Sequence, residues 1–151
     1  MNTMWYLLIA VAVLIVAGLA FYAGQLLWKV KAQNEAVAAE KQKKQKYLTD
    51  SISHIAKAMK EKQCEYSEGV LRIWVLLDHY NASQAEPKNY PELYPGFAKL
   101  YDVVKDMPTH EARKKLSKKD IFKMDTQRWE AEKEYEQQID TDLEVLMKEF
   151  P

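Results

Sequence analysis

The chain has 151 residues, of which about 120 lie outside an uncharged N-terminal stretch, enough for one modest domain with a single core. Lysine plus arginine equals aspartate plus glutamate at 22 each, so net charge gives no reason to expect a nucleic-acid partner. A single cysteine excludes an intrachain disulfide, and the scarcity of glycine (4) and proline (5) is typical of helical chains.

Charge is unevenly distributed along the chain, although it sums to zero. Residues 29–48 and 111–124 each carry a net charge of +4, whereas residues 49–110 carry −2 and residues 125–151 carry −6. The acidic residues 125–151 follow directly after the second basic segment and would repel a phosphate backbone bound there. We therefore expect no nucleic-acid partner.

The residues from Met4 to Trp28 predict one transmembrane helix, because no charged side chain precedes Lys29. These 25 residues span about 37 Å as a helix, against a hydrocarbon core of roughly 30 Å, and twelve of them are Leu, Ile, Val or Phe. Residues 1–28 are therefore assigned to a membrane anchor. Aromatic rings prefer the headgroup level, and four lie near the ends of the anchor: Trp5, Tyr6, Tyr22 and Trp28.

Lysines flank only the C-terminal end of the anchor, beginning with Lys29 and Lys31. Positive residues stay on the cytoplasmic side, so we expect the remaining chain to be cytoplasmic. A cleaved signal peptide is the alternative, with Gly18 and Ala20 before the cut, but the apolar run is long and no basic residue precedes it. Gly18 and Gly24, with Ala17 and Ala20, suggest pairing of two such helices in a homodimer. Their spacing is not a clean GxxxG motif, and small residues are common in any spanning helix, so this homodimer remains an alternative.

Residues 29–48 are rich in Ala, Lys, Gln and Glu, which favour a helix but leave little to bury. We interpret them as a solvated basic helical stalk. In the alternative interpretation, the lysines bind the headgroups of anionic lipids. Residues 49–151 then form the cytoplasmic helical domain.

Apolar residues at helical spacing predict a first long amphipathic helix with Gly69 between its two halves. Three of the five prolines fall within residues 81–95, which we interpret as a long connection, followed by a short helix that ends before Pro108. The apolar positions of the long helix are Leu48, Ile52, Ile55 and Met59, then Val70, Ile73, Trp74 and Leu77.

Ser117 and Asp120 resemble a capping box, so a last helix is predicted from about Lys118 to Phe150. Arg128 interrupts its apolar stripe, which is compatible with only a short coiled coil between copies. The predicted fold class is all-α: an N-terminal transmembrane helix, a helical stalk and a small cytosolic helical bundle of about three helices. The stripe consists of Ile121, Met124, Arg128, Tyr135, Ile139, Leu143, Leu146 and Phe150.

Chemistry-bearing residues are sparse. His54, Cys64, His79 and His110 show no metal-ligand spacing, and the four glycines are isolated, so no phosphate-binding loop is encoded. We predict no catalytic residue, no metal and no cofactor, and the sequence favours a non-enzymatic role.

One polar cluster is suggestive. Glu65, Glu68 and Arg72 share a helix face, and Glu68 with Arg72 form an i,i+4 pair. His110, Glu111 and Arg113 lie in the turn that follows Pro108. Either these residues form surface ion pairs, or a partly buried network joins the two segments and shapes a recognition surface.

The segments QCEYSEGVLRI (63–73) and PTHEARKKLSKKD (108–120), with the Tyr-Pro-rich connection between them, resemble a proteobacterial family of short single-pass membrane proteins, domain-of-unknown-function family 2489. The resemblance spans nearly the whole chain. It implies a bacterial inner-membrane location and no assigned activity. It also directs attention to Cys64, Glu65, Glu68, Arg72, His110 and Arg113.

Two functional hypotheses follow. The first is a membrane-tethered interaction module that binds an unidentified protein partner near the inner membrane. The second is a ligand-binding or enzymatic domain that uses the Glu/Arg/His cluster. A concave pocket lined by those residues favours the second hypothesis, whereas a flat, fully exposed or mutually paired arrangement does not.

Overall fold

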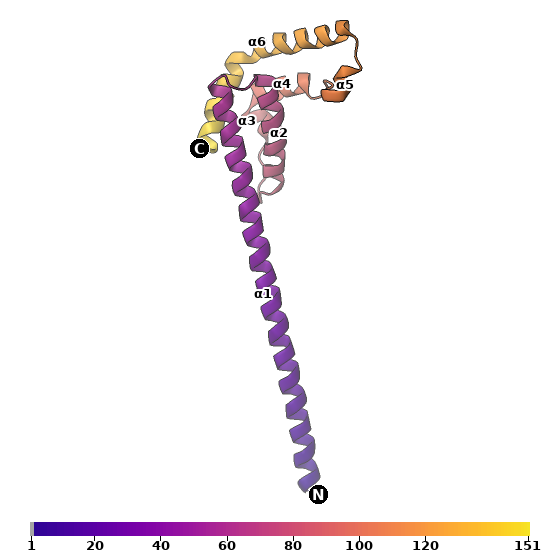
Figure 1. Ribbon diagram of the computed structural model, residues 1–151. Helices are drawn as coiled ribbons and strands as arrows, with labels where there is room; N and C mark the ends of the chain where they lie inside the picture. Colours follow the sequence, from indigo (N-terminus) through magenta and orange to yellow (C-terminus); the bar gives the residue numbers. More distant parts are fainter. Residues whose placement is uncertain (1) are drawn as a thin grey trace. The chain divides into compact units, whose positions relative to one another are not determined.

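The computed structural model describes residues 2–151, with side chains from residue 3 onward. These residues form helices and no strand (Figure 1). Compact units comprise Met1–Lys44 and Gln45–Pro151, and the core lies in the second. The all-α fold class is confirmed. The helices are α1 (Asn2–Lys60), α2 (Tyr66–Ala82), α3 (Tyr90–Leu93), α4 (Pro95–Val104), α5 (His110–Lys114) and α6 (Lys118–Glu149).

The first unit consists of the N-terminal part of α1. An 18-residue window there has a mean hydropathy of 2.6, and no residue of that window is buried. Within residues 2–151, α1 is the one helix that is long and apolar enough to be a candidate membrane span. Large apolar side chains occur all around this helix from Met4 to Trp28 and are exposed, although such a composition is typical of a helix buried in a protein core or in a membrane.

The predicted long amphipathic helix is wrong in one respect, because it is two helices. α1 ends at Lys60, and α2 begins at Tyr66. Lys62 adopts a left-handed conformation (φ 58°), its N–H donates to the Met59 carbonyl, and the Gln63 N–H donates to Ala58. This pair of hydrogen bonds is a Schellman motif, which terminates a helix and reverses the chain. The two apolar stripes therefore face each other across a turn.

The predicted connection over residues 81–95 is partly helical. α2 continues to Ala82, and α3 occupies Tyr90–Leu93. Pro91 and Pro95 lie in the first turns of α3 and α4, where the missing N–H of proline breaks no helical hydrogen bond. The prolines therefore start helices here instead of excluding them.

The last helix matches its prediction closely. α6 begins after Ser117, whose Oγ accepts a hydrogen bond from the Asp120 N–H at 3.1 Å. The Ser117 hydroxyl donates in turn to the Asp120 carboxylate at 2.6 Å. This predicted cap is confirmed. The core of the second unit uses only the half of α6 after Glu130, since Ala131 is the first buried residue of the helix.

The core is centred on the packing of α4 against α6 and α2. Gly96 permits the close approach: a Cβ there would lie 2.8 Å from the backbone of Ile139 on α6. The buried Asp142 carboxylate accepts a hydrogen bond of 2.9 Å from the Phe97 N–H, so it satisfies an orphan donor at the start of α4. The surrounding core comprises Ile52, Ala56, Met59, Val70, Ile73, Leu77, Tyr90, Tyr94, Phe97, Leu100, Val104, Ala131, Ile139, Leu143, Leu146 and Phe150.

Replacing Gly96 by Ala tests this packing. The added methyl meets the α6 backbone, which cannot move aside, so Gly96→Ala should lower the free energy of unfolding by about 1–3 kcal/mol. Gly18→Ala is the control for the substitution itself, because no atom beyond the backbone of its own helix lies within 4 Å of the Cβ that it adds. Urea unfolding of the full chain in detergent, followed by near-ultraviolet circular dichroism, measures both. A Gly96→Ala variant that loses no more stability than Gly18→Ala contradicts the assigned contact.

Candidate functional site

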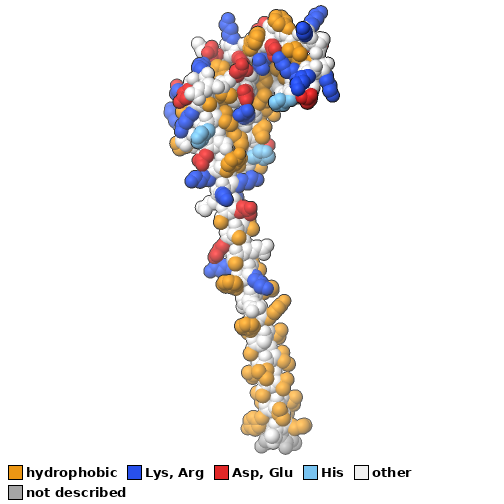
Figure 2. Space-filling model, viewed as in Figure 1, with side chains coloured by type: hydrophobic (Ala, Val, Ile, Leu, Met, Phe, Trp, Pro, Cys, Tyr) orange, Lys and Arg blue, Asp and Glu red, His pale blue; other side chains and the backbone are white. Residues whose placement is uncertain are grey.

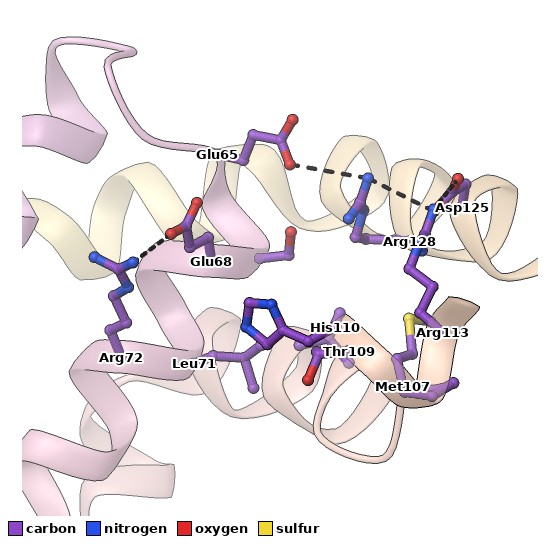
Figure 3. A pocket seen from close by; sticks show the side chains of 13 residues that line it. Glu65, Glu68, Leu71, Arg72, Met107, Thr109, His110, Arg113, Asp125 and Arg128 are labelled. Atoms are coloured by element: carbon purple, nitrogen blue, oxygen red, sulfur yellow. Dashed lines mark hydrogen bonds and ion pairs between the residues drawn. The ribbon is translucent and has the colours of Figure 1, made fainter. Parts of the chain in front are cut away.

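A surface cavity of about 470 Å³ lies where the start of α2, the segment from α4 to α5 and the N-terminal half of α6 meet (Figure 3). All of its residues belong to the second unit. It brings together five of the residues singled out from sequence, from segments about 40 positions apart. The lining residues are Glu65, Ser67, Glu68, Leu71, Arg72, Val104, Met107, Pro108, Thr109, His110, Arg113, Asp125 and Arg128.

The α2 side of the cavity carries an ion pair that sequence spacing predicted. Arg72 Nη2 lies 2.6 Å from Glu68 Oε1, one helical turn apart, and more than half of each side chain is exposed. Water screens such a pair, so it contributes little to stability. Its effect is to fix the direction of both side chains at the rim.

The opposite side carries a second pair, which joins α5 to α6. Arg113 Nη2 donates to Asp125 Oδ2 at 2.7 Å. This hydrogen bond holds the pKa of Asp125 below its ordinary range and raises that of Arg113. The pair anchors the five-residue helix α5 on α6 at the end of the cavity.

Arg128 is held more loosely than the other two arginines. Its Nη2 lies 3.9 Å from Glu65 Oε2 and 3.8 Å from Asp125 Oδ1, distances too long for hydrogen bonds. Its buried Nε has no hydrogen-bond partner among residues 3–151. In Figure 3 the side chain projects from α6 between Glu65 and Asp125. A bound acceptor cannot reach the buried Nε, but the Nη groups of Arg128 make no hydrogen bond among residues 3–151, so they are the donors available at this site.

The remaining wall is apolar, with a strained backbone at its edge. Leu71, Val104 and Met107 contribute aliphatic and thioether surface. His110 adopts a left-handed conformation (φ 45°), which is uncommon for a residue with a side chain and costs of order 1–3 kcal/mol. The site can therefore bind a molecule that joins an anionic group to an apolar one. Within the described residues, no His, Cys, Asp or Glu side chains cluster as metal ligands would.

Two residues of the predicted cluster lie outside the cavity. Glu111 pairs with Lys114 at 2.6 Å on the exposed side of α5. Cys64 lies in the turn before α2, where its Sγ contacts the Glu65 carbonyl at 3.5 Å. Burial, reinforced by the charge of Glu68, raises the pKa of the Cys64 thiol, so it is not activated as a nucleophile.

The predicted membrane-interface residues all lie on α1 with their side chains exposed. This holds for the aromatic rings Trp5, Tyr6, Tyr22 and Trp28. It also holds for the two lysines that follow, Lys29 and Lys31. Their assignment to an interface remains a prediction.

Sequence reasoning missed several lining residues. Arg128 carried a signal, because it interrupts the apolar stripe of α6. Asp125 stands three residues before it, on the same side of the helix, and was not singled out. Met107 and Thr109 carried no signal, because only the packing of α4 and α5 brings them to the cavity.

Fold and site together define a class: an all-α protein with a long apolar N-terminal helix and a small helical domain that carries an arginine- and glutamate-lined cavity. The chain belongs to the family described as "Protein of unknown function (DUF2489)", whose model matches residues 16–146. A Haemophilus influenzae protein described as uncharacterized is 36% identical over 147 residues, which cover 97% of this chain and 96% of that protein. No solved structure matches the chain. The resemblance inferred from the two motifs is confirmed, and the whole cavity lies within the matched range.

The pair between Arg113 and Asp125 makes a prediction about acid stability. The pKa of Asp125 is lower in the folded protein than in the unfolded chain. At a pH above the unfolded-state pKa, the ionised carboxylate therefore stabilises the fold. This stabilisation is lost as the pH falls through the folded-state pKa. Between about pH 5 and pH 2, Asp125→Asn should therefore lose less free energy of unfolding than the unmodified protein. Glu111→Gln, which removes an exposed carboxylate paired with Lys114, is the control and should follow the unmodified protein. Identical acid dependence in all three, measured by urea titration, argues against the pair.

Proposed function

We propose that the protein is a single-pass protein of the bacterial inner membrane whose C-terminal domain recognises another protein at the cytoplasmic surface. The cavity around Arg128 carries the proposal. It combines an available guanidinium with an apolar wall, which suits a partner segment that presents a carboxylate next to an apolar side chain.

The charge around Arg128 supports a carboxylate over a phosphate. Glu65, Glu68 and Asp125 also line the cavity, and they repel a ligand with two negative charges more strongly than one with a single charge. The pairing of Glu68 and Asp125 with other arginines leaves Arg128 as the cation with the weakest existing contacts. Leu71 and Met107 supply the contact for the apolar group.

The membrane location is supported by the distribution of charge on α1. No charged residue occurs within residues 1–28, and six lysines against two glutamates follow within residues 29–48. The apolar side chains of this part of α1 are exposed, so protein packing does not account for them. Insertion into lipid would cover these side chains, and the lysines on the C-terminal side of the apolar stretch favour a cytoplasmic C-terminal domain.

Membrane extraction tests the location directly. The full chain should stay in the membrane pellet after washing with alkaline carbonate, and a fluorescent protein fused after Pro151 should fold and fluoresce, as it does in the cytoplasm. Mass spectrometry of the purified chain should find residues 1–28 still attached. Release by carbonate, or a chain that begins after Ala20, contradicts the anchor and supports a cleaved signal peptide.

Crosslinking in cells tests the cavity. A photoreactive amino acid in place of Met107 should form an adduct with a partner protein, and Arg128→Gln should reduce that adduct at least about tenfold, since losing one member of a buried charged hydrogen bond costs more than 1.4 kcal/mol. Lys148→Gln removes an exposed charge at the far end of α6 and should leave the adduct unchanged.

The controls of this experiment separate the proposal from its alternatives. An adduct of equal yield from the exposed Gln137 shows contact without recognition by the cavity and contradicts the proposal. A free small carboxylate is the second candidate. The concave cavity and its volume, which is within the range of ligand pockets, favour it, whereas the ion pairs that already engage Arg72 and Arg113 count against it. It predicts no protein adduct at Met107 and a thermal stabilisation by small carboxylates that Arg128→Gln abolishes.

A further inference from the structure

An open apolar groove lies between the C-terminal part of α1 and α2, next to the cavity around Arg128. Its volume is about 450 Å³, and all of its residues belong to the second unit. Figure 2 shows hydrophobic side chains at the surface of this unit, among charged ones. Two that line the groove are half or more exposed, Tyr47 at 68% and Val75 at 50%. α1 contributes Tyr47, Ser51 and Ile55, and α2 contributes Leu71, Arg72, Val75 and Leu76.

The groove and the cavity form one continuous surface along α2. Leu71 and Arg72 line both of them. Glu68, Arg72 and Val75 follow one another at helical spacing, so the cavity passes into the groove along a single face of α2. In Figure 3, Arg72 lies at the end of the cavity opposite Asp125. The groove therefore begins where the cavity ends.

The walls of the groove decide the conformation of a protein segment bound there. Both walls are α-helices, whose backbone N–H and C=O groups are paired within each helix. Among the described residues that line the groove, only Tyr47, Ser51 and Arg72 carry polar side-chain groups. An extended segment would lose the hydration of its backbone without gaining hydrogen-bond partners, whereas a helix pairs its own backbone. The groove therefore favours a helix.

The openness of the groove favours a helix over a small apolar ligand or an acyl chain. Pockets for such ligands bury about 70–90% of the ligand surface. Here the side chains of Tyr47 and Val75 remain half or more exposed, so the walls do not enclose an occupant. An occupant must bring its own polar outer face, as an amphipathic helix does.

We propose that the partner segment recognised by the cavity is an amphipathic helix that continues along α2 and places its apolar face in this groove. This inference rests on the proposed function, because the cavity and the groove then bind one segment. Glu65, which lies beside Arg128, and Val75 are ten residues apart on α2, about 15 Å along its axis.

This length sets the pattern of the partner helix. An acidic residue binds Arg128, and apolar residues about four, seven and eleven positions away lie on the same face of the helix. No second acidic residue is needed in the groove, because Arg72, its one charged residue among those that the structure describes, already pairs with Glu68.

Photocrosslinking in cells measures the conformation of the bound segment on the full chain. A photoreactive amino acid in place of Glu68 and, in a second variant, in place of Val75 should capture the same partner protein. The two positions lie on one face of α2, seven residues and about 10.5 Å apart. Mass spectrometry of the adducts should find attachment points about seven residues apart in a helical partner, against about three residues in an extended one.

A charge in the groove tests whether the groove contributes to binding. Val75→Asp should lower the adduct formed from Met107 at least about tenfold, because the short carboxylate would be desolvated beneath the apolar face of the partner. Val145→Asp is the matched control. Val145 is 42% exposed on α6 and lines neither the cavity nor the groove, so this variant should leave the adduct unchanged.

The outcomes separate this inference from the function on which it rests. No protein adduct at Met107 in the otherwise unmodified chain contradicts the proposed function, and the helical segment with it. Three results contradict the helical segment alone, provided that the Met107 adduct forms. They are an adduct that Val75→Asp lowers no more than Val145→Asp, attachment points about three residues apart, and capture of a lipid instead of a protein from position 75.

Discussion

The N–H of Phe97 donates to the carboxylate of Asp142 inside the core, at the point where the missing side chain of Gly96 lets α4 rest on the backbone of α6. A buried carboxylate is costly unless its hydrogen bonds are filled, and here it also satisfies the N-terminal end of a helix. Burial raises the pKa of Asp142, while the hydrogen bond from Phe97 opposes that rise. This contact fixes the C-terminal half of α6 and, through the rigidity of the helix, the position of its N-terminal half.

The cavity follows from that placement. The N-terminal half of α6 contributes no buried residue before Ala131, yet it carries Asp125 and Arg128 over the start of α2 and over α5. Arg113 ties α5 to α6, and the ion pair on α2 fixes the other rim. The guanidinium of Arg128 is left between two carboxylates without a hydrogen bond to either. The same half of α6 therefore holds Arg128 in the cavity and leaves the rings of Phe122 and Trp129 exposed.

Much of the fold was predictable from local sequence patterns, and the errors in the prediction have identifiable physical causes. The apolar, uncharged composition marked the first helix, and the Ser117 cap marked the start of α6. The break between α1 and α2 escaped detection because Lys62, instead of glycine or asparagine, takes the left-handed position. As sequence signals, Pro91 and Pro95 indicate a connection, so α3 and the start of α4, where they occupy first-turn positions, were not predicted. In the site, helical spacing predicted the pair of Glu68 and Arg72, whereas Asp125 and Met107 reach the cavity only through tertiary packing.

Native-state hydrogen exchange, resolved by peptide mass spectrometry on the full chain in detergent, tests whether the contact between α4 and α6 holds the domain together. Amides of residues 97–104 and 139–146 should exchange last and together, because their opening requires loss of the whole core. Amides of residues 118–130, which pack on little of the core, should exchange earlier. Exchange over residues 97–104 that is as fast as over residues 118–130 would contradict the central place given to Gly96 and Asp142.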